Sequence, residues 1–378
     1  MIRWAGPAVA AALLALALLA VALTASSARA PTSFTVRRGP AAAPPPGAAA
    51  PPPAVRALVL ADFGDETAQQ SALSRAVAEA HARAPFDVAF SPGDNVYDCG
   101  PDPRRPGAAG CRFAEDGASI APGFAPPVDR RFDRFDARFP ALRKDGAPIP
   151  VFLALGNHDV ESRGQCADGA LAPDAQARLK ACLEVAHASA VWRMPGRHYL
   201  VDRGPARFVV LDSNLLLGDY GGFTLEGELA FLRAAAEGCR ERPCFVVAHH
   251  PAATAGQHRA EADAAYRARV RRLEEAAGGA IAAWLCGHDH DLQHLRAAAG
   301  YDVLVSGNAS RGRPRERFEK VSAPGAQLLF ASTAWGYLTI EVSARGWAAR
   351  FASVEGAPLH CCQASFPGRC EPVTCPAH

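Results

Sequence analysis

The sequence predicts an α/β protein whose strands are buried within a sheet. Short apolar runs of strand length recur from Val55 onward, and segments with helical periodicity separate several of them. Strands that alternate with helices are typical of a sheet covered by helices. In addition, three strand-like runs follow one another near the C-terminus with short turns between them, which predicts a second sheet.

The individual elements follow from the same periodicities. The expected strands are residues 55–61, 86–90, 149–155, 207–211, 244–248, 280–285 and 301–305. The expected helices are residues 66–83, 224–237 and 261–277. The C-terminal runs at residues 327–332, 336–342 and 347–353 are expected to be three antiparallel strands that close the second sheet.

The N-terminus predicts export. Arg3 precedes an uncharged Ala/Leu/Val run at residues 5–23, and small residues follow, so residues 1–30 are interpreted as a signal peptide. The run is also just long enough to span a bilayer, which leaves an uncleaved N-terminal anchor as the alternative. Residues 31–54 are rich in Pro and Ala and are expected to form an extended linker. In either case the expected catalytic domain, residues 55–355, is exported.

The charge balance argues against a nucleic-acid partner. The formal net charge is +2, and the Lys and Arg residues are scattered along the chain. The one basic run, residues 311–317, is expected to be a solvated loop. With 378 residues and 49% hydrophobic content, the chain is long enough to bury a large core.

Eleven cysteines agree with export, because disulfides form in oxidising compartments. Six of them, at positions 99, 111, 166, 182, 239 and 244, lie in polar stretches where bridges would staple loops. Four more crowd the C-terminal tail, residues 356–378. Cys286 ends an apolar run and is expected to be a buried free thiol. Spacing alone does not determine which cysteines pair.

Short polar motifs follow five of the expected strands. They are Asp62-Phe63-Gly64, Gly93-Asp94-Asn95-Val96-Tyr97, Gly156-Asn157-His158-Asp159, His249-His250-Pro251 and Gly287-His288-Asp289-His290. In open α/β sheets, ligands bind beyond the carboxyl ends of the strands. We therefore expect the motifs to share one rim and to supply seven metal ligands: Asp62, Asp94, Tyr97, Asn157, His249, His288 and His290. The four glycines are expected at sharp turns, where φ can be positive.

This mixture of oxygen and nitrogen donors suits two transition-metal ions side by side. A phenolate from Tyr97 favours a trivalent ion such as ferric iron, and the two oxygens of Asp94 can bridge two ions. Two ions about 3.5–4 Å apart can clamp the attacking and leaving oxygens of a phosphoryl transfer. The motifs therefore predict hydrolysis by a metal pair. Asp159 and Asp289 are expected to support the turns, and His250 and His294 to orient the ligands.

With these motifs, residues 55–353 resemble the metallophosphoesterases and, among them, the purple acid phosphatases of the small tartrate-resistant type. Residues 286–293, Cys-Gly-His-Asp-His-Asp-Leu-Gln, carry the resemblance most specifically. Trp192, Pro195, Tyr199 and residues 336–341 also fit. The resemblance implies a four-layer αββα sandwich of two mixed β-sheets flanked by helices.

The resemblance also implies the role of each ligand. Asp62, Tyr97 and His290 look like the ferric site, and Asp94 like the bridge. Asn157, His249 and His288 look like the site of a divalent metal, which is Fe, Zn or Mn. The implied catalytic residues are His158 and His258, although Gln257 stands where the mammalian form has a glutamate. The implied enzyme is an exported, monomeric acid phosphatase that attacks small phosphate monoesters with a metal-activated hydroxide.

Two other functions remain open from the sequence. One is a phosphodiesterase with manganese or zinc in both positions, and the other is a non-catalytic metal-binding or phosphate-binding module. The intact His158 argues against the binding module, because binding alone needs no proton donor. Two insertions, after Tyr97 up to Arg130 and at residues 164–183, follow metal-binding turns and are expected to rim the pocket and to control substrate access.

Overall fold

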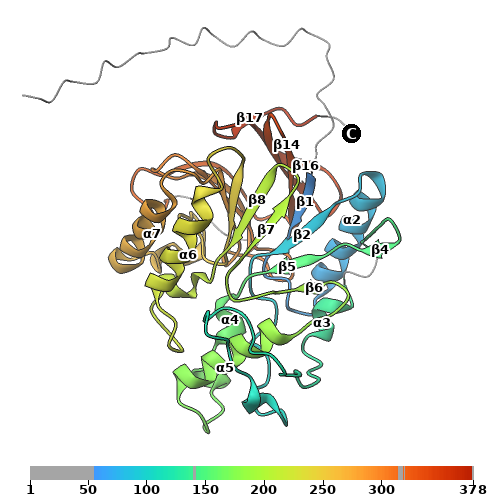
Figure 1. The fold of residues 1–378 in the computed structure, drawn as a ribbon. Helices are drawn as coiled ribbons and strands as arrows, with labels where there is room; N and C mark the ends of the chain where they lie inside the picture. The colour runs from blue at the N-terminus through green and yellow to red at the C-terminus, as the bar shows by residue number, and fades with distance from the viewer. Residues whose placement is uncertain (1–54, 139–141, 314–317, 319, 377–378) are drawn as a thin grey trace, which may run out of the picture. The chain divides into compact units, whose positions relative to one another are not determined.

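Two mixed β-sheets packed face to face form the centre of the described part of the chain (Figure 1). The computed structural model describes residues 55–138, 142–313, 318 and 320–376. Residues 1–54, which include the predicted signal peptide and linker, lie outside this description. None of the helices formed by the described residues is long and apolar enough to cross a bilayer.

The first sheet has eight strands in the order β17-β16-β15-β14-β1-β2-β5-β6. Strands β1, β2, β5 and β6 run parallel to one another, and β14 to β17 are added antiparallel beside β1. The strands are β1 (Val55–Val59), β2 (Val88–Ser91), β5 (Val151–Leu153), β6 (Trp192–Arg193), β14 (Gly336–Ser343), β15 (Gly346–Ser353), β16 (Pro358–Ser365) and β17 (Glu371–Val373).

The second sheet has seven strands in the order β13-β11-β12-β10-β9-β8-β7. Its central strands β8, β9, β10 and β12 are parallel, and antiparallel strands lie at both edges. The strands are β7 (Tyr199–Arg203), β8 (Ala206–Val210), β9 (Cys244–Val247), β10 (Ala283–Cys286), β11 (Leu292–Arg296), β12 (Asp302–Ser306) and β13 (Gln327–Ser332). A separate hairpin joins β3 (Arg143–Lys144) and β4 (Ala147–Pro148).

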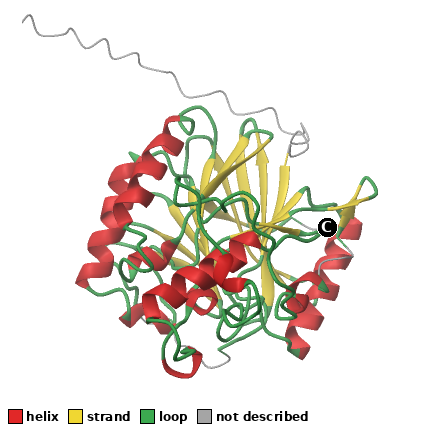
Figure 2. Cartoon of the chain, turned by 60° about the horizontal axis from the view of Figure 1, so that its bottom comes forward, coloured by secondary structure: helices red, strands yellow, loops and turns green. Residues whose placement is uncertain are grey.

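Helices lie on the outer sides of the sheets (Figure 2). Each of three long helices begins after a side-chain cap: Thr67, Thr224 or Asp263 accepts a hydrogen bond from a backbone N–H in the first turn. The helices are α2 (Ala68–Arg83), α3 (Asp133–Asp136), α4 (Asn157–Val160), α5 (Pro173–Ala186), α6 (Leu225–Glu237) and α7 (Ala264–Ala277). The 3₁₀ turns are η1 (Ala108–Gly110), η2 (Gly164–Cys166), η3 (Ser213–Leu216) and η4 (Gln257–Ala260).

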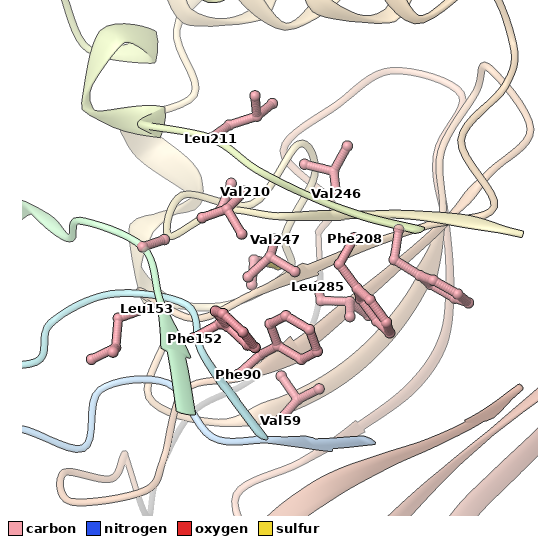
Figure 3. Close-up of a cluster of buried hydrophobic side chains, with 14 of the residues drawn as sticks. Val59, Phe90, Phe152, Leu153, Phe208, Val210, Leu211, Val246, Val247 and Leu285 are labelled. Atoms are coloured by element: carbon pink, nitrogen blue, oxygen red, sulfur yellow. The ribbon is translucent and has the colours of Figure 1, made fainter. Parts of the chain in front are cut away.

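Aromatic side chains fill the space between the two sheets (Figure 3). The ring of Phe90 on β2 lies 4.3 Å from that of Phe208 on β8, centre to centre. Phe245 on β9 lies 5.3 Å from Trp347 on β15 in an edge-to-face contact. Each of these fully or nearly fully buried rings contributes about 1.5–3 kcal/mol to folding. The core therefore fixes the relative position of the two sheets, and with it the strand ends that carry the motifs.

The expected α/β fold with two mixed sheets is confirmed, and all seven expected strands in the first part of the domain are present. The expectation for the three C-terminal runs is wrong in one respect. Strand β13 pairs with β11 in the seven-stranded sheet, whereas β14 and β15 extend the eight-stranded sheet. The helix expected to begin at Glu261 begins after Asp263, because Asp263 provides the cap.

Two segments outside the expected elements are also ordered into secondary structure. The second insertion forms α5, which begins with Pro173 in the first turn, a position where proline needs no hydrogen-bond partner. The C-terminal tail contains β16 and β17, and these strands continue the eight-stranded sheet beyond β15.

Five disulfides join ten of the eleven cysteines, and Cys286 is the buried free thiol that the sequence predicts. The bridges Cys99–Cys166 and Cys111–Cys182 tie the two insertions together. Cys239–Cys244, Cys361–Cys375 and Cys362–Cys370 close short loops.

Removing the Cys111–Cys182 bridge should destabilise the domain more than removing Cys239–Cys244. The bridged cysteines are 71 residues apart in the first case and 5 in the second. The chain-entropy model predicts losses of about 4 and about 2 kcal/mol, respectively. Denaturant unfolding of the two double Cys→Ala proteins measures the difference. Equal losses would show that loop closure in the unfolded chain does not determine the stabilisation.

Candidate metal centre

The structure brings all seven predicted metal ligands to one edge of the sheets. Asp62 follows β1, Asp94 follows β2 and Asn157 opens α4 just beyond β5, all in the eight-stranded sheet. His249 follows β9 and His288 follows β10 in the seven-stranded sheet. Since these strands are parallel within each sheet, their carboxyl ends meet at a common edge.

One cluster consists of Asp62, Tyr97 and His290. The Tyr97 hydroxyl donates to Asp62 Oδ1 at 2.9 Å and lies 3.2 Å from His290 Nε2. His290 Nε2 is 3.4 Å from the same carboxylate oxygen. A phenol, a carboxylate and an imidazole therefore point toward one another, with all three side chains buried.

A second cluster consists of Asn157, His249 and His288. Asn157 Oδ1 lies 2.9 Å from His249 Nε2 and 3.0 Å from His288 Nδ1, and the two imidazole nitrogens are 3.2 Å apart. Asp94 stands between the clusters. Its Oδ1 is 3.4 Å from His249 Nε2, and its carboxylate also groups with Asp62 and His290. This is the position that a bridging carboxylate requires.

The hydrogen bonds behind the second cluster fix which nitrogens carry lone pairs. His249 Nδ1 donates to the Pro92 carbonyl at 2.9 Å, and His288 Nε2 donates to Glu261 Oε2 at 2.8 Å. Neutral His249 and His288 therefore turn unprotonated nitrogens toward Asn157 Oδ1. Three lone pairs within about 3 Å of one another repel, so the geometry fits a cation between them.

Buried acidic groups lead to the same conclusion for the first cluster. Burial raises the pKa of Asp62 to about 8. Burial also favours the neutral form of Asp94, but His249 and His158 outweigh it and lower the pKa of that carboxyl. Burial and the neighbouring carboxylate of Asp62 raise the pKa of Tyr97 well above its ordinary value. Ionising these oxygens together requires a strong Lewis acid, which agrees with the hard donor set of the cluster.

The backbone at the ligands is strained. Asp62, Asp94 and His288 have φ values of 60°, 54° and 69°, in the left-handed region that side chains other than Gly rarely adopt. Such residues cost about 1–3 kcal/mol each and persist where the surroundings hold them. Three of the seven ligands therefore occupy conformations that folding alone does not favour.

The glycines of the motifs are required mainly because neighbouring loops approach each other closely, and less because their φ angles are positive. Of the four glycines expected to adopt positive φ, only Gly93 does, with φ 89°. A Cβ on Gly156 would overlap the backbone of Asp94, and one on Gly287 would overlap the Asp62 carboxylate. These glycines thus allow the ligand loops of different strands to touch.

Two buried carboxylates hold the loops, as the sequence predicts. Asp159 accepts backbone N–H groups of Gly156, Asn95 and Val96 at 2.7–2.9 Å, and so joins the Asn157 loop to the Asp94 loop. Asp289 accepts the His258 N–H at 2.8 Å and the Thr254 hydroxyl, and so fixes the loop after β9.

The two predicted catalytic histidines lie beside the clusters. The ring of His158 is 4.6 Å from that of Tyr97, and His158 Nδ1 bonds the Asp98 carbonyl at 2.7 Å. The ring of His258 is 4.1 Å from that of His288, and His258 Nδ1 bonds Glu261 Oε1 at 2.6 Å. Each histidine is thus held through Nδ1.

Glu261 is a site residue that the sequence analysis missed. One of its oxygens bonds His258 and the other bonds His288, so it orients a predicted ligand and a predicted catalytic residue together. The expected helix start at Glu261 concealed this role. The spacing His258-x-x-Glu261 is the signal that could have revealed it, because the 3₁₀ turn η4 brings these residues together.

Arg311 was expected in a solvated basic loop and instead packs against the site. Its guanidinium lies 3.8 Å above the Tyr97 ring and pairs with Asp65 at 2.9 Å and Asp98 at 2.6 Å. Residues 314–317 of the same run lie outside the described part of the chain.

Of the two flanking histidines expected to orient ligands, one lies at the site. His250 packs its ring 4.6 Å from that of His288 and bonds the Ser213 hydroxyl. His294 instead bonds Asp302 and His360, away from the ligands, because it lies on β11 with its side chain in the core.

A family model for calcineurin-like phosphoesterases matches residues 55–292. The chain is 22% identical over 269 residues to tartrate-resistant acid phosphatase type 5 of Rattus norvegicus, covering 65% of this chain and 75% of the relative. It is 23% identical over 264 residues to the Mus musculus protein, covering 63% of this chain and 74% of the relative.

Two solved structures share the fold. One is purple acid phosphatase PPD1 from yellow lupin seeds, with a TM-score of 0.57 and 12% identity over 83% of this chain and 55% of that chain. The other is GAP50, the anchor in the inner membrane complex of Plasmodium, with a TM-score of 0.58 and 16% identity over 83% and 90% of the two chains.

Replacing Tyr97 with Phe should remove visible absorption from the iron-loaded protein, because phenolate-to-iron charge transfer requires the Tyr97 oxygen in the first cluster. Absorption spectra of the two proteins, matched for iron content, measure this. Tyr199→Phe is the control, since the Tyr199 hydroxyl donates to the Leu153 carbonyl outside the clusters. A band that survives in the Tyr97→Phe protein would contradict the ligand assignment.

Proposed function

The chain belongs to the calcineurin-like phosphoesterase family, and from this premise we propose that it is an exported acid phosphatase that hydrolyses phosphate monoesters at an iron-containing metal pair. The observation that carries the proposal is the pair of ligand clusters with Asp94 between them and a tyrosine in one cluster. The similarity to tartrate-resistant acid phosphatases supports the choice of substrate class. The five disulfides support export.

In this proposal each cluster would hold one ion. Asp62, Tyr97 and His290 would hold ferric iron, Asn157, His249 and His288 would hold a divalent ion, and Asp94 would serve as a ligand shared by the two sites. When bound, the pair supplies Lewis acidity toward the phosphate and a hydroxide nucleophile near neutral pH. The protein supplies fixed donors, and the strained loops hold them in place before substrate arrives.

His158 is the candidate proton donor to the leaving group. Its backbone N–H donates to Asp94 Oδ1 at 3.0 Å, and its Nδ1 donates to the Asp98 carbonyl, so the residue is anchored twice. Nε2 remains available to the phosphate oxygen or the departing alkoxide. The side chain is only half-buried, which suits contact with a substrate that enters from solvent.

His258 and Glu261 form a second proton-carrying unit. Burial lowers the pKa of His258, but the hydrogen bond to Glu261 outweighs it and raises that pKa. Burial likewise raises the pKa of Glu261, but His258 and His288 outweigh it and hold the pKa far below the ordinary value. His258 is therefore a cation over a wider pH range and can stabilise the phosphate charge.

The proposed function is tested by assaying the purified protein on an aryl phosphate monoester and the matching diester, together with metal analysis. We expect hydrolysis of the monoester, a strong preference over the diester, iron in the protein and a visible band. A colourless protein with manganese or zinc that prefers the diester would instead establish the phosphodiesterase alternative.

His158→Ala should lower kcat by about 10²–10⁴-fold, the range in which a positioned proton donor contributes. The metal content should not change, because the imidazole of His158 is not among the cluster donors. His187→Ala is the control, since His187 stacks on Phe132 and bonds Asp136 away from the clusters. Unaltered turnover in the His158→Ala protein would remove His158 from the mechanism.

Glu261→Gln should move the alkaline limb of the pH–kcat/KM profile to lower pH. The sign follows from His258: Glu261 raises its pKa, so the protonated form and the activity it supports persist to higher pH and are lost as pH rises through that pKa. Without the carboxylate, His258 loses its proton at lower pH. If the Glu261→Gln protein has normal metal content and its alkaline limb lies at the same pH as in the unaltered protein, His258 does not control that limb.

A further inference from the structure

The two insertions meet beside the candidate metal centre and border an open cavity of about 390 Å³. Cys99 from the first insertion and Gln165 from the second form part of its wall, and the Cys99–Cys166 bridge joins them there. Arg131 and Arg134, which follow the first insertion, form another part. We call this space the side cavity.

The side cavity begins next to the residues proposed for catalysis. Tyr97 and Asp98 line it. The hydroxyl of Tyr97 lies in the first ligand cluster, and the carbonyl of Asp98 bonds His158 Nδ1. A substrate whose phosphate lies at the clusters therefore has the side cavity as a neighbouring space for its alcohol portion.

Arg134 brings a positive charge without a carboxylate partner. Its Nη1 donates to the Tyr97 carbonyl at 3.0 Å, and no described residue forms an ion pair with it. Arg131 donates to the Gly100 carbonyl at 2.8 Å, and its closest carboxylate is that of Asp102 at 3.9 Å. Both guanidiniums are only partly buried, and each uses one nitrogen for a backbone oxygen.

The carboxylates of the wall pair with a cation other than Arg134. Asp65 and Asp98 line the side cavity, but both pair with Arg311, at 2.9 Å and 2.6 Å. Asp102, the carboxylate nearest Arg131, is also paired with Arg104 and Arg105, so among the described residues Arg134 is the lining cation that no ion pair neutralises. Guanidinium groups with free N–H donors bind carboxylate and phosphate oxygens in pairs.

We propose that the side cavity is an anion-binding subsite for the leaving group, so that the preferred substrates are phosphate esters whose alcohol portion carries a carboxylate or a second phosphate. This inference rests on the proposed function, because it assumes that the ester phosphate is held at the two clusters. Arg134 is the principal contact and Arg131 the second.

Matched substrates that differ by one charge test the subsite. Phenyl phosphates with a para carboxyalkyl chain of one, two or three methylenes are compared with their primary amides, which keep size and leaving-group chemistry but lose the charge. A phosphonate in place of the carboxylate shows which anion is preferred. We expect at least one chain length to give a KM about ten-fold lower for the acid than for the amide, since a hydrogen bond to a charged group contributes at least about 1.4 kcal/mol.

Arg134→Gln should reduce the acid-to-amide ratio of kcat/KM from about ten to about one, and Arg131→Gln should reduce it partly. Arg104→Gln is the matched control: Arg104 lies in the first insertion with 65% of its side chain exposed and does not line the side cavity. It should keep the ratio. Equal kcat/KM values for acid and amide at every chain length in the unaltered protein would overturn the proposal, as would an unchanged ratio in the Arg134→Gln protein.

Saturation-transfer NMR on the metal-loaded protein separates this proposal from the proposed function. The probe is 4-hydroxyphenylacetate, the phosphate-free product of the shortest substrate. We expect a signal with the unaltered protein and its loss with Arg134→Gln. If 4-hydroxyphenylacetate binds but no ester is hydrolysed, the proposed phosphatase activity is refuted and the subsite is supported. If acid and amide esters are hydrolysed equally well and 4-hydroxyphenylacetate does not bind, the subsite alone is refuted.

Discussion

The mutual repulsion of donor groups at one edge of the sheets is the constraint on which the rest of the structure depends. Asn157, His249 and His288 turn lone pairs toward one another, and Asp62 and Asp94 bring two buried carboxylates to the same place. Such an arrangement is unfavourable in a protein without bound cations. It becomes favourable when two cations occupy the clusters, so the binding chemistry of the site explains a geometry that packing does not.

The surrounding structure holds these groups together at some cost. Three predicted ligands have left-handed backbone, and Asp159 accepts three backbone hydrogen bonds and Asp289 two hydrogen bonds that fix the loops around them. The aromatic core between the sheets places the strand ends, and Glu261 sets the orientation of His288. The two sheets thus position the candidate metal centre, while the disulfide-linked insertions form part of the wall of the neighbouring cavity.

The sequence predicted that these seven side chains would meet at one edge, because their motifs follow strands that local periodicity locates. It failed where a role depends on tertiary contact. The partner strand of β13 is set by long-range pairing with β11, which no local pattern encodes. Arg311 looked like one member of a basic run, and only the fold places it over Tyr97. Glu261 appeared to begin a helix, whereas it follows the 3₁₀ turn η4, which brings it to His258 and His288.

Anomalous diffraction from crystals of the metal-loaded protein, collected above the zinc edge, where manganese, iron and zinc all give a signal, and on both sides of the iron edge, tests the central claim most directly. The account predicts two peaks about 3.5–4 Å apart. One should lie among Asp62, Tyr97 and His290, with iron signal, and the other among Asn157, His249 and His288. A single peak, or clusters that remain in direct hydrogen-bond contact with no density between their donors, would contradict it.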